Sequence, residues 1–179
     1  MSVRTPTPNP SPPGGAEQVT SIAAPSPLVG EGRGGGEPEP VEHGAKATPL
    51  VIVVACALVD ADGRVLIARR PVGKAMAGLW EFPGGKVEEG ERPETTLIRE
   101  LKEELGIDVT EACLAPLTFA SHGYSDFHLL MPLYVCRRWH GTVSAHQHSE
   151  LKWVRPQRLR DYPMPPADEP LIPHLIDAL

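Results

Sequence analysis

One amphipathic segment, residues 93–105, constrains the fold of this chain more than any other. Pro93 suits the first turn of a helix, and Gly106 is the type of residue that ends one. The apolar stripe of this helix consists of three leucines at i+4 spacing, Leu97, Leu101 and Leu105. The opposite face is charged, so we expect the helix to lie on a sheet with its leucines buried.

The segments on either side of this helix have the pattern of strands. Residues 51–59 form a β-branched apolar run, residues 64–69 alternate, and Asp60–Gly63 between them has turn composition, which together predict a hairpin. Further elements are expected as strands at 79–82, 117–122, 127–138 and 151–154 and as a last helix from Glu169 toward the C-terminus. Strands interleaved with two helices indicate an α/β or α+β sandwich with a mixed sheet.

The first 47 residues differ in composition from the rest. They hold nine of the 21 prolines and eight of the 17 glycines, and they have no aromatic residue. Such a segment cannot bury enough apolar surface to offset the entropy lost on ordering. The sequence therefore predicts a disordered N-terminal segment, residues 1–47, followed by one domain, residues 48–179.

Charge and hydropathy exclude several classes of protein. The formal net charge is −6, which argues against a protein that coats duplex nucleic acid. The longest apolar run spans residues 50–59, about half of what a membrane helix needs. The three cysteines form neither a disulfide framework nor a zinc pattern, as expected for thiols in a reducing compartment. We therefore expect a cytoplasmic monomer with no membrane partner.

Three glutamates share one face of the predicted helix. Glu100, Glu103 and Glu104 stand at i, i+3 and i+4, where each like-charged pair costs roughly 0.2–0.5 kcal/mol. They also lie in the second half of the helix, where the macrodipole disfavours anions. A solvated acidic face is one interpretation. A cation is the other, and hard oxygen ligands favour Mg²⁺ or Mn²⁺.

The surroundings of these glutamates favour the metal site. Gly84 and Gly85 place bare backbone beside the helix, and Arg99 adjoins Glu100. The whole segment from Gly85 to Ile107 resembles the Nudix box, GX5EX7REUXEEXGU with U apolar, at every specified position. The resemblance implies a Nudix-type α/β/α sandwich with a mixed β-sheet. It also implies metal-dependent hydrolysis of a nucleoside diphosphate linked to another group.

Specific roles follow from the resemblance to the box. It implies that the metal is bound by the Gly85 carbonyl, Glu100, Glu103 and Glu104. Glu91 would support this site from behind the ligands, and Arg99 would position Glu100. The reaction implied is in-line attack of water on the β-phosphorus, with a glutamate accepting the proton.

The likeness continues outside the box, over about residues 50–175. Arg69-Arg70 and residues 79–86 and 161–170 resemble MutT-type members of the family. Those enzymes hydrolyse oxidised purine nucleoside triphosphates, notably 8-oxo-dGTP, to the monophosphate and pyrophosphate, which removes a mutagenic precursor of DNA. The resemblance implies that Arg70 and Lys86 bind a small nucleoside triphosphate and that Asp168 reads the edge of its base.

Two positions depart from the MutT-type pattern. Asp168 stands where an asparagine is common, and a carboxylate only accepts when ionised. Asp168 is therefore either protonated in a desolvated pocket or an acceptor for ring N–H groups, unless it only shapes the pocket or caps the last helix. The loop 145–150 lacks the usual Glu-Gly-Gln, and Glu150 is its only carboxylate. The general base is then either Glu100 or a residue of this loop.

Other interpretations stay open. His146 and His148 have the spacing of a metal pair, but we expect two histidines in a polar loop to be incidental. The substrate of a Nudix hydrolase can instead be a dinucleoside polyphosphate, a sugar nucleotide or a pterin triphosphate. A non-catalytic module that senses a nucleotide would be expected to have lost carboxylates of the box, whereas this chain keeps all of them.

Overall fold

The computed structural model describes residues 48–179, and the disorder predicted for residues 1–47 lies outside this range. The strands are β1 (Leu50–Leu58), β2 (Val65–Arg69), β3 (Trp80–Glu81), β4 (Gly84–Lys86), β5 (Leu114–Gly123), β6 (His128–Cys136) and β7 (Glu150–Val154). The α-helices are α1 (Pro93–Leu105) and α2 (Ile172–Ala178). Short 3₁₀ turns are η1 (Glu111–Cys113), η2 (Pro156–Asp161) and η3 (Glu169–Leu171).

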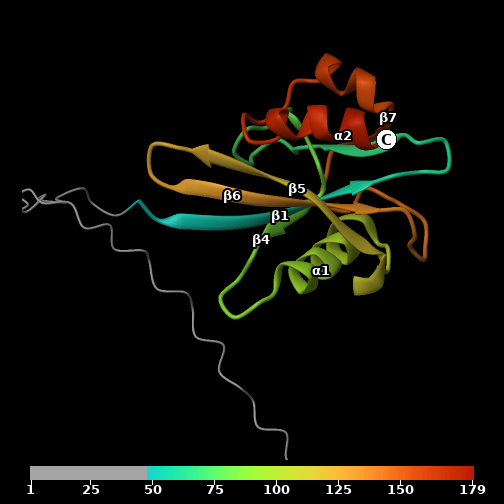
Figure 1. The fold of residues 1–179 in the computed structure, drawn as a ribbon, viewed down its shortest axis with the longest axis horizontal. Helices are drawn as coiled ribbons and strands as arrows, with labels where there is room; N and C mark the ends of the chain where they lie inside the picture. The colour runs from blue at the N-terminus through green and yellow to red at the C-terminus, as the bar shows by residue number, and fades with distance from the viewer. Residues whose placement is uncertain (1–47) are drawn as a thin grey trace, which may run out of the picture. The chain divides into compact units, whose positions relative to one another are not determined.

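Two sheets form the middle of the domain. The larger has the strand order β4-β1-β6-β5, in which β1 and β6 are parallel and the other pairs are antiparallel. The smaller has the order β3-β2-β7 and is antiparallel. Figure 1 shows α1 on one side of the strands and α2 on the other. This arrangement confirms the predicted α/β/α sandwich with a mixed sheet.

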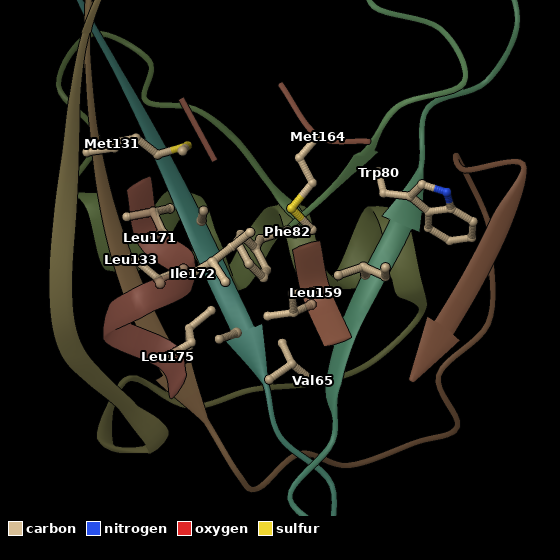
Figure 2. Packing of buried hydrophobic residues seen from close by; sticks show 14 of the residues in the cluster. Val65, Trp80, Phe82, Met131, Leu133, Leu159, Met164, Leu171, Ile172 and Leu175 are labelled. Atoms are coloured by element: carbon tan, nitrogen blue, oxygen red, sulfur yellow. The ribbon is translucent and has the colours of Figure 1, made fainter. Parts of the chain in front are cut away.

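Each helix covers its own hydrophobic core. The α1 core contains Leu97, Leu101 and Leu105, all 0% exposed, so the predicted apolar stripe is confirmed. Burying a leucine side chain contributes about 1.5–3 kcal/mol, which makes this stripe the main attachment of α1. The α2 core appears in Figure 2, where Leu171, Ile172 and Leu175 belong to one buried cluster with Val65 and Leu133.

The predicted ends of α1 are confirmed. Pro93 occupies the first turn, and Gly106 has a left-handed backbone with φ of 73°. The Gly106 N–H donates to the Lys102 carbonyl over 3.1 Å, which satisfies an acceptor that the helix end leaves free. The last helix begins at Glu169 as predicted, but its first turn is the 3₁₀ turn η3 and α2 follows.

The hairpin predicted from residues 51–69 is wrong. The turn itself forms, with the Gly63 N–H donating to the Asp60 carbonyl over 3.1 Å. Beyond it, however, β1 and β2 share one isolated bridge, Val59 to Val65. Both edges of β1 are occupied by β4 and β6. The chain therefore crosses from the larger sheet to the smaller one at this turn.

The Pro-Gly-Gly segment after β3 also differs from the prediction. The expected strand spans residues 79–82 and does not include this segment, but Gly84–Lys86 forms β4 and pairs with β1. Glycine is rare in strands, so residue propensities do not predict a strand at Gly84–Lys86. At Gly84 a Cβ atom would collide with the Val54 carbonyl oxygen, so this close pairing needs glycine. No helix within residues 48–179 is long and apolar enough to cross a membrane.

Candidate active site

A cavity of about 300 Å³ opens beside β4 and the acidic face of α1. It brings together residues that are far apart in the sequence. Of the predicted site residues, those that line it are Arg70, Gly85, Lys86, Glu100, Glu104 and Asp168. Glutamates that suit a cation and basic groups that suit phosphate thus face the same space.

Arg99 connects the carboxylates of the box. Its Nε and Nη2 atoms each lie 3.1 Å from an oxygen of Glu91, and its Nη1 lies 2.8 Å from Glu100 Oε1. Nη1 also lies 3.7 Å from Glu103 Oε1. Arg99 therefore relieves part of the repulsion among the acids, and its contact with Glu100 fits the positioning role implied by the resemblance.

Glu91 contacts Arg99 and is not among the residues that line the cavity. The Arg99 guanidinium and the Thr96 hydroxyl, which donates over 2.7 Å, lower the pKa of Glu91 to about 2. Glu91 is then ionised at any physiological pH. A permanent anion behind Arg99 fixes the guanidinium, which agrees with a supporting place behind the proposed ligands.

Glu104 is the most buried glutamate of the three. Its side chain is 12% exposed, and its Oε2 accepts the Gly84 N–H over 3.1 Å. Burial raises the pKa of Glu104 to about 7, although the nearby His148 and the Gly84 N–H oppose that shift. A bound cation would favour the ionised form.

The donor set fits a hard divalent cation. A Cβ atom on Gly85 would collide with the Glu100 carboxylate, so the backbone of β4 lies directly against a proposed ligand. Within residues 48–179, no three acidic, histidine or cysteine side chains are yet close enough together to hold a metal ion. The carboxylates are apart because each has another partner. Glu100 accepts a hydrogen bond from Arg99, and Glu104 accepts one from the Gly84 N–H. Binding would require these carboxylates to turn from those partners.

Two predicted ligands are more exposed than the others, and one of them, Glu103, is not among the residues that line the cavity. Lys86, the last residue of β4, lines the cavity with an exposed side chain. Glu103 lies one turn along α1 from Glu100, and its side chain is 48% exposed. Their roles stay predictions.

Arg70 is held by two partners. Its Nη1 forms an ion pair with Glu81, and its Nε donates to the Ala75 carbonyl over 2.7 Å. The second contact anchors the loop between β2 and β3, from which Lys74 also reaches the cavity. Arg70 lines the cavity, and its role in holding a nucleotide stays a prediction.

Asp168 also lines the cavity. It is 5% exposed, and its Oδ1 accepts the Phe82 N–H over 3.2 Å. Although Asp168 precedes η3, its side chain makes no capping hydrogen bond, so helix capping does not explain the residue. Burial raises the pKa of Asp168 to about 7, and the Phe82 N–H opposes that shift. Both protonation states considered from the sequence are therefore accessible near neutral pH.

Glu150 does not reach the cavity. It begins β7, and its carboxylate oxygens lie 3.5 Å from Arg69 Nη1 and 3.7 Å from Lys152 Nζ. Gln147 and His148 line the cavity instead. Their placement depends on hydrogen bonds between this loop and the end of α1, which leave no pattern in the local sequence. The sequence analysis set His148 aside as incidental and did not name Glu81, yet both line the cavity.

Comparisons with known proteins agree with this geometry. The family model for the NUDIX domain matches residues 54–174. A CTP pyrophosphohydrolase of Escherichia coli is 41% identical over 124 residues, covering 68% of this chain and 89% of that protein. An 8-oxo-dGTP diphosphatase of Proteus vulgaris is 39% identical over 97 residues, covering 54% and 85%.

The solved structure of the E. coli ORF135 protein superposes with a TM-score of 0.65 at 37% identity, covering 73% of this chain and 91% of that one. Nudix hydrolases generally use divalent metal ions. The match over most of the domain, together with these relatives, shows that the chain belongs to the Nudix family as a MutT-like pyrophosphohydrolase.

Proposed function

We propose that this chain hydrolyses nucleoside triphosphates to the monophosphate and pyrophosphate with Mg²⁺, and that 8-oxo-dGTP is its principal substrate. The product cannot be incorporated into DNA directly, so the reaction would clean the cytoplasmic nucleotide pool. The observation that carries the substrate assignment is Asp168, a buried carboxyl group that shares one cavity with the acidic face of α1.

Each residue of the proposed site has a separate role in the reaction. Gly85, Glu100, Glu103 and Glu104 would hold the cation, and Arg99 would fix Glu100. A divalent ion bound there neutralises charge on the phosphates and acidifies the attacking water. Lys86 and Arg70, which both line the cavity, supply positive charge to the triphosphate. Glu100 is the candidate general base, because Glu150 lies outside the cavity.

Asp168 supports a preference for the oxidised base. Oxidation of guanine at C8 converts N7 from an acceptor into an N–H donor. An ionised carboxylate accepts from that donor, whereas it meets a second acceptor at N7 of guanine. Sites built around one hydrogen bond discriminate strongly against an analogue that lacks it.

CTP is a second candidate, favoured by the 41% identical relative that is named a CTP pyrophosphohydrolase. The 4-amino group of cytosine is a donor that an aspartate can accept. Asp168 therefore fits either base.

Steady-state kinetics on 8-oxo-dGTP, dGTP and CTP test the proposal. With Mg²⁺ we expect kcat/KM for 8-oxo-dGTP to exceed that for dGTP at least about tenfold. A higher value for CTP would move the assignment to pyrimidines. Absence of pyrophosphate release from all three nucleotides would contradict the reaction itself.

The variant Asp168→Ala tests the role of this residue. We expect it to reduce kcat/KM for 8-oxo-dGTP much more than for dGTP, because only the oxidised base loses a hydrogen bond. An equal loss on both substrates would mean that Asp168 only shapes the pocket through its bond to Phe82. The exposed Asp177 on α2, changed to alanine, serves as the matched control.

A further inference from the structure

A buried histidine lies between the part of the cavity proposed to bind the nucleotide and the part proposed to bind the metal. The His148 side chain is 3% exposed, and its Nε2 lies 3.4 Å from Glu81 Oε1 and 3.8 Å from Glu104 Oε1. Glu81 is the ion-pair partner of Arg70, on the nucleotide side. Glu104 is a proposed metal ligand on the other side. One imidazole nitrogen thus faces a carboxylate from each part.

The loop that carries His148 is fastened to the end of α1. The Ser144 N–H donates to the Leu105 carbonyl over 3.1 Å, and the His146 N–H donates to the Glu104 carbonyl over 2.9 Å. The His146 ring covers Gly106, where a Cβ atom would lie 2.6 Å from its Cε1. These contacts fix the position of His148 relative to the box.

The second nitrogen of His148 distinguishes it from an ordinary structural histidine. Nδ1 is buried and has no hydrogen-bond partner among residues 48–179. Buried polar atoms normally have partners, so a histidine kept only for packing would be expected to satisfy both nitrogens. Here the polar contacts of the ring are with Glu81 and Glu104, on the side that faces the reaction.

We propose that His148 is a positioning residue for the hydrolysis, an inference that rests on the proposed function. Its Nε2 lies between two carboxylates that would otherwise repel each other, and it stays beside Glu104 when that carboxylate turns from the Gly84 N–H toward a metal ion. It also links Glu104 to the Arg70–Glu81 pair that holds the nucleotide. The loop therefore contributes an imidazole to this site rather than a carboxylate.

Three variants test this role, His148→Leu, His148→Gln and the exposed control His174→Leu. Leucine removes the nitrogen, whereas the glutamine amide places a donor close to the position of Nε2. The readouts are kcat and KM for the best of the three nucleotides, the Kd for Mn²⁺ alone by calorimetry, and Tm.

We expect His148→Leu to lower kcat about tenfold or more and to raise the Kd for Mn²⁺ about tenfold, with KM within about threefold of the wild type. His148→Gln should recover most of both losses, and His174→Leu should match the wild type. Unchanged kcat and Mn²⁺ affinity in His148→Leu, or equal losses in the leucine and glutamine variants, would overturn the role.

If His148→Leu does not fold, His148→Asn replaces it, because the shorter amide does not reach the Nε2 position. Equal kcat in the asparagine and glutamine variants would then overturn the role. Wild-type protein that hydrolyses none of the nucleotides would overturn the proposed function instead. The two failures are therefore distinguishable.

Discussion

Asp168 carries a carboxyl group into the cavity, where ionisation is costly. Its pKa of about 7 exceeds the value near 3.9 expected in the unfolded chain. Between these values the folded state binds more protons than the unfolded state, so the free energy of unfolding falls as pH rises from about 4 to 7. The buried carboxyl group of Asp168 therefore lowers the free energy of unfolding at neutral pH.

The variant Asp168→Asn should remove this cost. The amide oxygen can still accept the Phe82 N–H, but the side chain no longer ionises. We expect the variant to be more stable than the wild type by about 2–4 kcal/mol at pH 8 and nearly equal to it at pH 4. Thermal unfolding of both proteins from pH 4 to pH 8 measures the difference. Parallel Tm curves would show that Asp168 does not titrate in this range.

Glu103 is the proposed ligand that the fold needs least. Its side chain is 48% exposed, and its distance of 3.7 Å from Arg99 indicates a weak ion pair. Glu103→Gln should change the free energy of unfolding by less than about 0.5 kcal/mol. It should lower kcat about 10- to 100-fold, because a neutral amide is a poorer metal ligand.

The matched control for Glu103→Gln is Glu89→Gln, which lies before α1 and is exposed. It removes the same charge without touching the acidic face of α1. Treatment of wild-type protein with EDTA should abolish activity, and added Mg²⁺ should restore it. Full activity after EDTA treatment would contradict the metal site.

The sequence identifies the carboxylates of the box because helical spacing is local. Glu100, Glu103 and Glu104 project from one face whatever the rest of the chain does. The proximity of His148 and Glu81 cannot be predicted from helical spacing. Their meeting depends on a loop that hydrogen-bonds to the end of α1 and on a two-residue strand, β3, that pairs with β2.

The junction between α1 and the loop 144–148 depends on one glycine. Gly106 has a φ of 73°, which costs roughly 1–2 kcal/mol for a residue with a Cβ atom. That atom would also lie 2.6 Å from the His146 ring. Gly106→Ala should therefore displace the loop as well as strain the helix end.

We expect Gly106→Ala to lower Tm by roughly 3–10 °C and to lower kcat beyond what the stability loss explains. Below Tm the wild-type and variant proteins are both folded, so the kcat difference reports the displaced loop. Gly90→Ala is the control, because Gly90 also has a positive φ, 80°, but no atom within 4 Å of an added Cβ. Equal kcat values for the two variants would show that displacing the loop does not affect catalysis.

Strand pairing is the part of the fold that local patterns predict least well. The β-branched run at residues 51–59 and its turn predict a strand that ends near Val59, which is right. The partner of that strand is decided by distant segments. β6 approaches in parallel from more than 70 residues later, and β4 takes the other edge. The hairpin between β1 and β2 is excluded only when both sheets assemble and β4 and β6 occupy the edges of β1.

The layered domain contains both cores and the whole candidate site within residues 48–179. The family model begins only at residue 54. The first element, β1, starts at Leu50 and supplies Val54 to the α1 core and Ala55 to the α2 core. The segment before it has the composition of a chain that cannot form a core of its own.

Deletion of residues 1–47 should therefore leave the enzyme almost unchanged. We expect kcat/KM within about twofold of the full chain and Tm within about 2 °C, because a segment of this composition is expected to bury little apolar surface and so to contribute little to stability. Deletion of residues 1–54 is the contrasting variant. It removes half of β1 together with Val54, which is 0% exposed, and should unfold the domain or lower Tm by more than about 10 °C. A fall of several degrees on removing residues 1–47 alone would show that this segment packs on the domain, contrary to the interpretation of its composition.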